Sequence, residues 1–286
     1  TFDPEEALEL VERHDVTGVL AVPTQLRALN GVQKAAETPY DTDSLQYIRT
    51  GGAIVTEDLI EETNEYLCDQ VYNTYGMTEA GADLTFAHPS AQDEHPGTIG
   101  KEAFAWELRV VESPGLSQTP DPEATVDAGE RGEIIARGPG MSDGYIDNDE
   151  AEAKSYFDGW LRTRDIAEID DDGFLYIVDR VDNMIVSGGE NIYPAAVERV
   201  LGNHPDVAEA CVFGRDDEQW GQIVTAVVVT EPGAEVTDED LEGYCRQHDG
   251  LADFKRPRVY AITDEPLPRS DTGTVLREQL VETYFS

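Results

Sequence analysis

Residues 72–81, YNTYGMTEAG, place several side chains that suit phosphate chemistry within ten positions. The ring of Tyr75 offers a flat face on which an adenine base can stack. The hydroxyl of Thr78 can bond a phosphate oxygen, and Glu79 supplies a hard oxygen ligand of the kind that Mg²⁺ prefers. Gly76 allows a ligand to approach the backbone closely. Because short motifs often occur by chance, this stretch taken alone fits an ordinary turn with an exposed glutamate at least as well.

Two further stretches have residue types that could contact a nucleotide. In TGGA, residues 50–53, Gly51 and Gly52 give backbone freedom and Ala53 would let a base lie close. A glycine pair is also a common turn signal, so a plain turn at a strand end is the alternative. In GWLRTRD, residues 159–165, the carboxylate of Asp165 could accept hydrogen bonds from both hydroxyls of a ribose, since a diol supplies two donors. The alternative there is a surface aspartate in an acidic protein.

The segment 179–194, DRVDNMIVSGGENIYP, combines a charged stretch with a second glycine pair. Arg180 and Asp182 lie in the charged stretch, which is consistent with a linker. Gly188 and Gly189 leave a wall without side chains, although a tight turn before a helix at Pro194 would need the same residues.

The elements that position these stretches change in character along the chain. Over residues 1–98 helical patterns alternate with short apolar strands, which predicts a parallel sheet with helices on its faces. Asp3 and Thr56 are expected helix N-caps. Ligands of such sheets sit beyond the carboxyl ends of the strands, where TGGA and YGMTEAG both fall.

Residues 99–178 read as strands separated by Gly, Pro and Asp turns, which predicts an antiparallel β unit with a hairpin turn at DDDG. Residues 183–286 return to mixed helices and strands. A helix is expected from Pro194 with Gly202 just past its end, and Thr237 begins another with a capping signal. The predicted fold class is therefore α/β plus β: part of a large α/β domain, an antiparallel β unit and a small, mobile α+β domain.

The composition is strongly acidic. Sixty Asp and Glu residues against twenty Lys and Arg leave a formal net charge of −40, spread along the whole chain. A basic partner is one interpretation, but solvation of the surface in a salt-rich cytoplasm is favoured because screening removes the self-repulsion. Nucleic acid is not expected as a partner, since phosphate binding needs clusters of Lys and Arg. No apolar run is long enough for a membrane span. The three cysteines have no zinc or redox spacing and are expected to be buried and reduced.

Taken together and in order, four stretches resemble the AMP-forming acyl-CoA synthetases: YNTYGMTEAG, GWLRTRD, DRVDNMIVSGGENIYPAAVE, and FKRPR followed by LPRSDTGTVLR. In that family a carboxylate attacks ATP to give an acyl-adenylate, the small C-terminal domain rotates, and a thiol then takes the acyl group. The resemblance implies ATP or AMP, Mg²⁺ and coenzyme A as cofactors or co-substrates, and a small carboxylic acid as substrate. The acid is expected to be a fatty acid, with an aryl acid also open.

The resemblance also implies roles for single residues of this chain. Glu79 would bind the metal and act with Thr78 in catalysis, Arg180 would contact ribose or phosphate beside Asp165, and residues 179–182 would form a hinge at Asp182. Gly188 and Gly189 would border the tunnel for the pantetheine arm. The remaining implied nucleotide contacts are Gly52, Ala53, Asn73, Tyr75 and Gly76.

The chain departs from the family pattern in three places. Arg164 stands where the family has a glycine, Thr274 stands where it has its catalytic lysine, and no Ser/Thr/Gly-rich loop of the form SGTTGxPKG is present. Since such loops bind phosphates through backbone N–H groups, we expect the chain to be the C-terminal portion of a longer protein and, as it stands, not to adenylate. Lys255 or Arg269 could compensate for the lost lysine.

Several alternatives stay open on the sequence. The chain could be a non-catalytic nucleotide- or partner-binding relative, or an adenylation domain that serves a carrier protein. It ends soon after TGTVLR, which favours a free-standing ligase over the carrier-linked kind. Its expected partners are the upstream portion of the same protein and, as a further possibility, a second copy in a homodimer.

Overall fold

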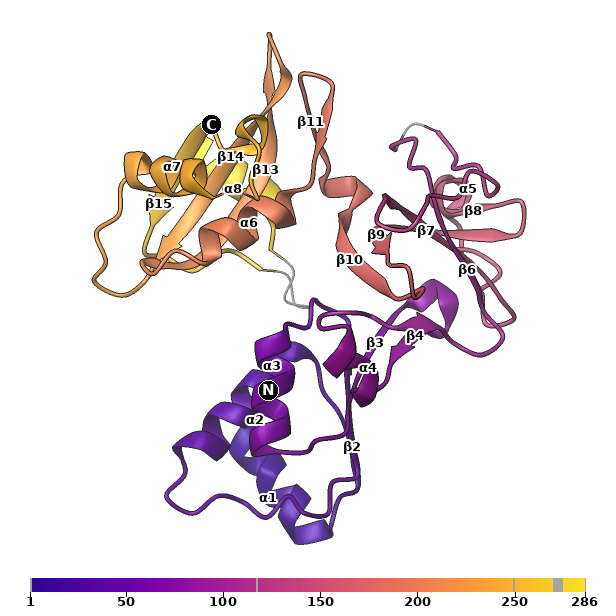
Figure 1. Cartoon of the computed structure of the whole chain (residues 1–286), viewed down its shortest axis with the longest axis vertical. Coiled ribbons are helices and arrows are strands. Elements are labelled where there is room, and N and C mark those ends of the chain that lie inside the picture. The colour runs from indigo at the N-terminus through magenta and orange to yellow at the C-terminus, as the bar shows by residue number, and fades with distance from the viewer. Residues whose placement is uncertain (1, 117, 249, 270–274, 286) are drawn as a thin grey trace. The chain divides into compact units, whose positions relative to one another are not determined.

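The computed structural model describes residues 2–116, 118–248, 250–269 and 275–285. The chain divides into two compact units, Thr1–Ile177 and Val178–Ser286 (Figure 1). The division lies next to the segment 179–182 that the sequence analysis assigns to a hinge. That this segment acts as a hinge stays a prediction.

The N-terminal unit begins with a five-stranded sheet in the order β1-β2-β3-β4-β5. The first three strands pair in parallel, as the helix–strand alternation predicts. The last two add to the edge in antiparallel fashion, which the sequence analysis did not predict. The strands are β1 (Gly18–Leu20), β2 (Tyr47–Gly51), β3 (Val71–Met77), β4 (Ala82–Ala87) and β5 (Lys101–Glu102).

Three helices pack on this sheet through one apolar cluster, which includes Leu8, Leu26 and Leu59 from the helices with Ile48 and Val71 from the strands. They are α1 (Pro4–His14), α2 (Pro23–Ala35) and α3 (Glu57–Tyr66); the short α4 (Pro89–Glu94) follows β4.

The two expected helix caps differ in what their side chains do. The Asp3 carboxylate accepts hydrogen bonds from the backbone N–H groups of Glu5 and Glu6, as expected for an N-cap. Thr56 stands at the N-cap of α3, but its hydroxyl accepts from the guanidinium of Arg27 on α2 instead of capping the helix.

The second part of the N-terminal unit is an antiparallel sheet in the order β10-β9-β7-β6, with β8 paired to β9. The DDDG segment forms the turn between β9 and β10: the N–H of Gly173 donates to the Asp170 carbonyl, and Gly173 adopts φ 85°. The antiparallel β unit and its hairpin are thereby confirmed. The elements are β6 (Glu107–Val111), β7 (Arg131–Arg137), α5 (Asp149–Ser155), β8 (Tyr156–Phe157), β9 (Trp160–Ile169) and β10 (Leu175–Arg180).

The C-terminal unit is a sheet in the order β12-β11-β14-β13, with β15 parallel to β14. Helices α6 and α7 pack on one face and α8 on the other, because alternate residues of β13 enter two clusters: Val212 joins the first, and Cys211 and Phe213 join the second. The elements are β11 (Ile185–Ser187), β12 (Glu190–Ile192), α6 (Pro194–Gly202), β13 (Val207–Asp217), β14 (Gly221–Thr230), α7 (Asp238–Gln247), β15 (Val259–Thr263) and α8 (Arg277–Phe285).

The local signals in this unit mostly hold. Thr237 and Asp240 form the expected reciprocal cap of α7. Gly202 is the last residue of α6 and not the first residue past it.

All three cysteines of the chain are buried and free, as expected. Among the described residues no helix has both the length and the apolar character needed to cross a membrane.

Candidate nucleotide and acyl site

Tyr75 and Asp165 meet, although ninety residues separate them. The Tyr75 hydroxyl donates a hydrogen bond of 2.6 Å to Oδ2 of Asp165. Tyr75 lies on β3 of the first sheet and Asp165 on β9 of the second, where it is 8% exposed. The fold therefore brings two of the predicted nucleotide contacts side by side.

A bulge in β9 positions Asp165. Glu133 pairs with Ile166 and Ile135 with Arg162, so three residues of β9 stand opposite the single residue Ile134. The middle one of the three, Arg164, adopts φ 61°, in the left-handed region. That conformation favours glycine, which gives a physical reason for the glycine that the family has at this position.

An open pocket of about 600 Å³ lies at the carboxyl ends of β1, β2 and β3. Gly51 and Gly52 border it at the end of β2, and residues 76–78 border it at the end of β3. A side chain at position 51 is sterically excluded, since a Cβ there would lie 2.1 Å from the carbonyl oxygen of Thr74. Residues of TGGA and of YGMTEAG therefore line the same pocket. The full lining is Leu20, Ala21, Val22, Arg49, Gly51, Gly52, Thr74, Gly76, Met77, Thr78, Gly81 and Asp83.

The other predicted residues of this region do not line the pocket. Ala53 is exposed after the end of β2. Asn73 is buried, and its side chain donates to the carbonyl oxygen of Thr98 at 2.9 Å. The observed contact of Asn73 is therefore a structural one, and its role toward a nucleotide stays a prediction.

Arg49 and Asp83 form an ion pair of 2.7 Å in the pocket wall, which the sequence analysis missed. The Arg49 guanidinium also lies 6.0 Å from the ring centre of Phe86, and its Nε is buried without a hydrogen-bond partner among the described residues. The available signal was a basic residue two positions before the glycine pair, in a chain that has few basic residues.

Glu79 lies in the short 3-10 helix η1 (Thr78–Ala80) that follows β3. Its Oε1 accepts a hydrogen bond from the hydroxyl of Tyr145. Burial, and secondarily this bond, raises the pKa of Tyr145, so its hydroxyl stays protonated and available as a donor.

The oxygen atoms of Thr78 and Glu79 fit Mg²⁺, which is commonly held by one or two carboxylates together with substrate phosphates. Within the part of the chain that the structure describes, no group of three or more His, Cys, Asp or Glu side chains could enclose a metal. The donor set therefore suits a cation shared with a phosphate ligand.

In the C-terminal unit, Gly188 and Gly189 form the turn between β11 and β12, with φ of 61° and 89°. The N–H of Gly188 donates to the carbonyl oxygen of Trp220 at 2.8 Å, and a Cβ on Gly188 would lie 2.9 Å from the Trp220 ring. A Cβ on Gly189 would meet nothing within 4 Å. Packing against Trp220 therefore excludes a side chain at position 188, whereas the space beside Gly189 is open.

Arg180 and Asp182 are paired with each other at 3.1 Å and are both exposed. The neighbouring Asp179, which the sequence analysis did not single out, is 7% exposed. Its carboxylate accepts from the N–H of Ala195 at 2.8 Å and from the side chain of Asn183 at 3.0 Å. Asp179 thereby ties the segment 179–183 to the first turn of α6.

The segment that contains Thr274 lies outside the described residues, but both arginines that flank it are described. Arg269 forms an ion pair with Glu209 on β13. Arg277 contacts Glu198 on α6 at 3.2 Å, and its Nε donates to the carbonyl oxygen of Val212. Both arginines have acidic partners within the C-terminal unit, so compensation for the missing lysine by Arg269 would have to break an ion pair.

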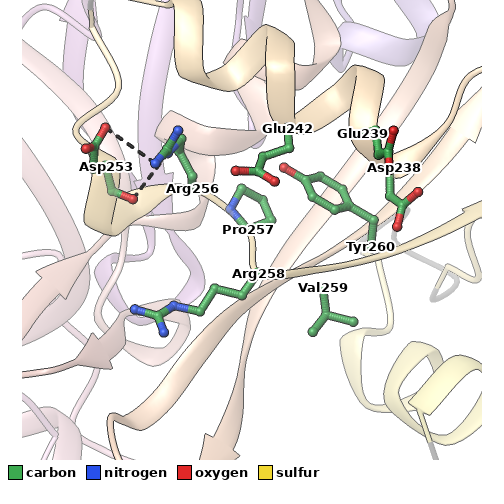
Figure 2. A pocket seen from close by; sticks show the side chains of 9 residues that line it. All are labelled: Asp238, Glu239, Glu242, Asp253, Arg256, Pro257, Arg258, Val259 and Tyr260. Carbon is green, nitrogen blue, oxygen red and sulfur yellow. Dashed lines mark hydrogen bonds and ion pairs between the residues drawn. The ribbon is translucent and has the colours of Figure 1, made fainter.

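A pocket of about 540 Å³ lies between α7 and β15 in the same unit (Figure 2). Asp238, Glu239 and Glu242 line it from α7. On the other side Arg256 turns toward Asp253, while Arg258 points away from the α7 carboxylates. The Arg258 guanidinium lies 4.3 Å from the ring centre of Trp220, the residue that packs under Gly188. Basic and aromatic side chains thus lie next to the glycine turn.

Comparison with known proteins identifies the family of the chain. The family model described as AMP-binding enzyme matches residues 1–146, and that of the AMP-binding enzyme C-terminal domain matches residues 196–274. The chain belongs to this family of adenylate-forming enzymes and corresponds to the C-terminal part of acyl-CoA ligases in it.

The relatives include named acyl-CoA ligases. The 2-succinylbenzoate–CoA ligase of Bacillus licheniformis is 38% identical over 279 residues, which cover 98% of this chain and 54% of the relative. A 3-[(3aS,4S,7aS)-7a-methyl-1,5-dioxo-octahydro-1H-inden-4-yl]propanoyl:CoA ligase of Mycobacterium tuberculosis is 36% identical, covering 99% of this chain and 52% of the relative. The chain spans about half the length of the curated relatives it matches.

Among solved structures, o-succinylbenzoate CoA synthetase from Bacillus subtilis in complex with its acyl-adenylate intermediate matches with a TM-score of 0.81 and 35% identity. The match covers 98% of this chain and 54% of the other. The same synthetase is known in complex with ATP and magnesium ion, at a TM-score of 0.80. The expected fatty acid substrate finds no support in the names of these relatives.

Proposed function

We propose that the chain is the C-terminal part of an AMP-forming acyl-CoA ligase that activates a carboxylic acid bearing a second polar group. The observation that carries the proposal is the pocket lined jointly by TGGA and YGMTEAG. Backbone-lined strand ends of this kind suit a flat base and a phosphate chain.

The reaction would proceed in two steps. A carboxylate oxygen attacks the α-phosphorus of ATP and pyrophosphate leaves; the thiolate of coenzyme A then attacks the acyl carbon and AMP leaves. Asp165 would accept from the ribose hydroxyls, and the Thr78 hydroxyl would bond a phosphate oxygen. Glu79 would hold Mg²⁺, which neutralises phosphate charge when bound.

The C-terminal unit would serve the second step. Gly189 offers an open wall for the narrow pantetheine arm, as the family resemblance implies. Arg258 beside Trp220, with Lys255 and Arg256 close in sequence, forms the densest basic run in a chain of net charge −40. Phosphates of coenzyme A are the anionic groups that such a run would attract.

The acid is proposed from the Arg49–Asp83 pair. A plain fatty acid would press an alkyl chain against an ion pair, whereas a second carboxylate or a keto oxygen could bond the guanidinium. 2-Succinylbenzoate, the acid in the names of several relatives, has both groups. An aromatic diacid of this kind therefore replaces the fatty acid as the proposed substrate.

The test uses the full-length protein that contains this chain, with ATP, coenzyme A, Mg²⁺ and three acids: 2-succinylbenzoate, benzoate and palmitate. We expect AMP and thioester with the diacid at the highest kcat/KM. Arg49→Leu should lower kcat/KM for the diacid about 10- to 100-fold, the equivalent of one hydrogen bond to a charged group, and leave benzoate little changed. Absence of AMP and thioester with every acid would instead support the non-catalytic alternative.

A further inference from the structure

The segment 138–145, which follows β7, braces the turn that carries Glu79. The backbone carbonyl of Glu79 accepts a hydrogen bond of 2.8 Å from the N–H of Ser142. A Cβ on Gly81 would lie 2.8 Å from the carbonyl oxygen of Gly140, and one on Gly140 would lie 2.9 Å from that of Ala80. The two backbones therefore touch directly, without side chains between them.

The same segment also holds the Glu79 side chain, through Tyr145. The Tyr145 hydroxyl donates to Oε1 of Glu79. The Tyr145 ring lies edge-on against that of Tyr156, with centroids 5.9 Å apart, and its backbone N–H donates to Glu152 on α5. These contacts limit the movement of the ring, so the hydroxyl can fix one orientation of the carboxylate.

We propose that Tyr145 is a positioning residue for the metal- and phosphate-binding step: it occupies Oε1 of Glu79 and leaves Oε2 for the cation. The inference rests on the proposed function, because that function makes Glu79 the carboxylate for Mg²⁺. Outer partners of ligating carboxylates orient the ligand, and their loss typically weakens metal affinity or activity 10- to 100-fold.

The chain supplies a matched pair of variants. Tyr145→Phe removes only the hydroxyl that contacts Glu79. Tyr156→Phe removes a hydroxyl that bonds the side chain of Ser142 in the same segment and does not contact Glu79. Both keep the ring pair, so a difference between them reports on the carboxylate and not on general loosening of the segment.

The experiment measures equilibrium Mn²⁺ binding to the full-length protein in the presence of ATP, by electron paramagnetic resonance. We expect the dissociation constant to rise about tenfold or more in Tyr145→Phe and to stay level in Tyr156→Phe. The Mg²⁺ concentration for half-maximal AMP formation should shift likewise, while KM for the acid does not change. In a Glu79→Gln background, Tyr145→Phe should have no further effect.

Two results would overturn the inference: equal Mn²⁺ affinity in wild type and Tyr145→Phe, or an equal loss in both tyrosine variants. They differ from failure of the proposed function, in which the wild-type protein itself neither binds Mn²⁺ with ATP nor forms AMP. That last result would contradict both the proposed function and the positioning role of Tyr145.

Discussion

At the scale of single residues, the backbone conformation of Arg164 explains why the family has a glycine at this position. The residue before Asp165 must adopt φ 61°, in the left-handed region, because it forms the middle of the β9 bulge. An L-residue with a Cβ pays about 1–2 kcal/mol for that conformation. The arginine therefore occupies a strained backbone conformation directly before Asp165.

We expect Arg164→Gly to be more stable than Arg164→Ala by about 1 kcal/mol, because both lose the same side chain and only glycine is free of the Cβ penalty. Urea unfolding of the N-terminal unit measures the difference. The reverse order of the two variants would show that position 164 is not strained.

Thr274 is the second residue at which the chain departs from the family pattern, and the resemblance implies that this departure affects catalysis. Threonine is neutral and shorter than the lysine of the family, so a preorganised positive charge is missing from the adenylation step. We expect Thr274→Lys in the full-length protein to raise the rate of acyl-adenylate formation about 10²- to 10³-fold. Pyrophosphate release measures this rate.

Two controls accompany the Thr274 variant. Thr274→Gln supplies length without charge and should not raise adenylation. Thioester formation from supplied acyl-adenylate should stay level in both variants, since we expect the residue at position 274 to affect the first half-reaction far more than the second. A Thr274→Lys protein that adenylates no faster than wild type would contradict the prediction.

At the scale of elements, a buried ion pair joins β7 and β9 to the loop after β6. Arg162 bonds Glu133 through two nitrogens, at 2.6 and 2.8 Å, and both side chains are almost fully buried. The same guanidinium donates to the carbonyl oxygens of Gly115 and Gln118. Arg162 belongs to GWLRTRD, but the sequence analysis named only Arg164 and Asp165 of that stretch. The observed contacts of Arg162 are structural.

Arg162→Met should lower the free energy of unfolding of the N-terminal unit by about 3–5 kcal/mol, because it leaves the Glu133 carboxylate buried without its cation. Arg131→Met is the control on the neighbouring strand. Arg131 and its partner Glu168, 3.4 Å away, have side chains that are 41% and 40% exposed, so loss of this pair should cost less than about 1 kcal/mol. Equal losses in chemical denaturation would show that burial does not decide the strength of these pairs.

For the whole molecule, charge is the dominant global property. The chain carries a formal net charge of −40 at pH 7, and its negative charges repel one another in the compact state. Salt screens that repulsion, with a screening length of about 10 Å at 0.1 M and about 3 Å at 1 M. We expect the thermal unfolding midpoint to rise by several degrees between 0.1 and 2 M KCl. A midpoint that does not rise would contradict the prediction. An equal rise in sucrose of the same osmolality would show that solute exclusion, and not charge screening, stabilises the protein.

The order of the elements could be read from the sequence because its signals are local. The Asp3 cap, the Thr237 capping box, the glycine turn at 173 and the period-2 strands each depend on residues within a few positions of one another. The antiparallel strands β4 and β5 were missed because their pairing depends on a neighbouring strand and not on a local pattern.

The sequence by itself determined the family, the succession of α/β, β and α+β parts, and which stretches could contact a nucleotide. Only the tertiary structure decided which side chains meet: Tyr75 with Asp165, Arg49 with Asp83, and Tyr145 with Glu79. Each of these pairs joins residues that lie 34 to 90 positions apart. Their contact depends on strand register, on the β9 bulge and on the glycine-lined approach of two loops, and these features exist only once the sheets have formed.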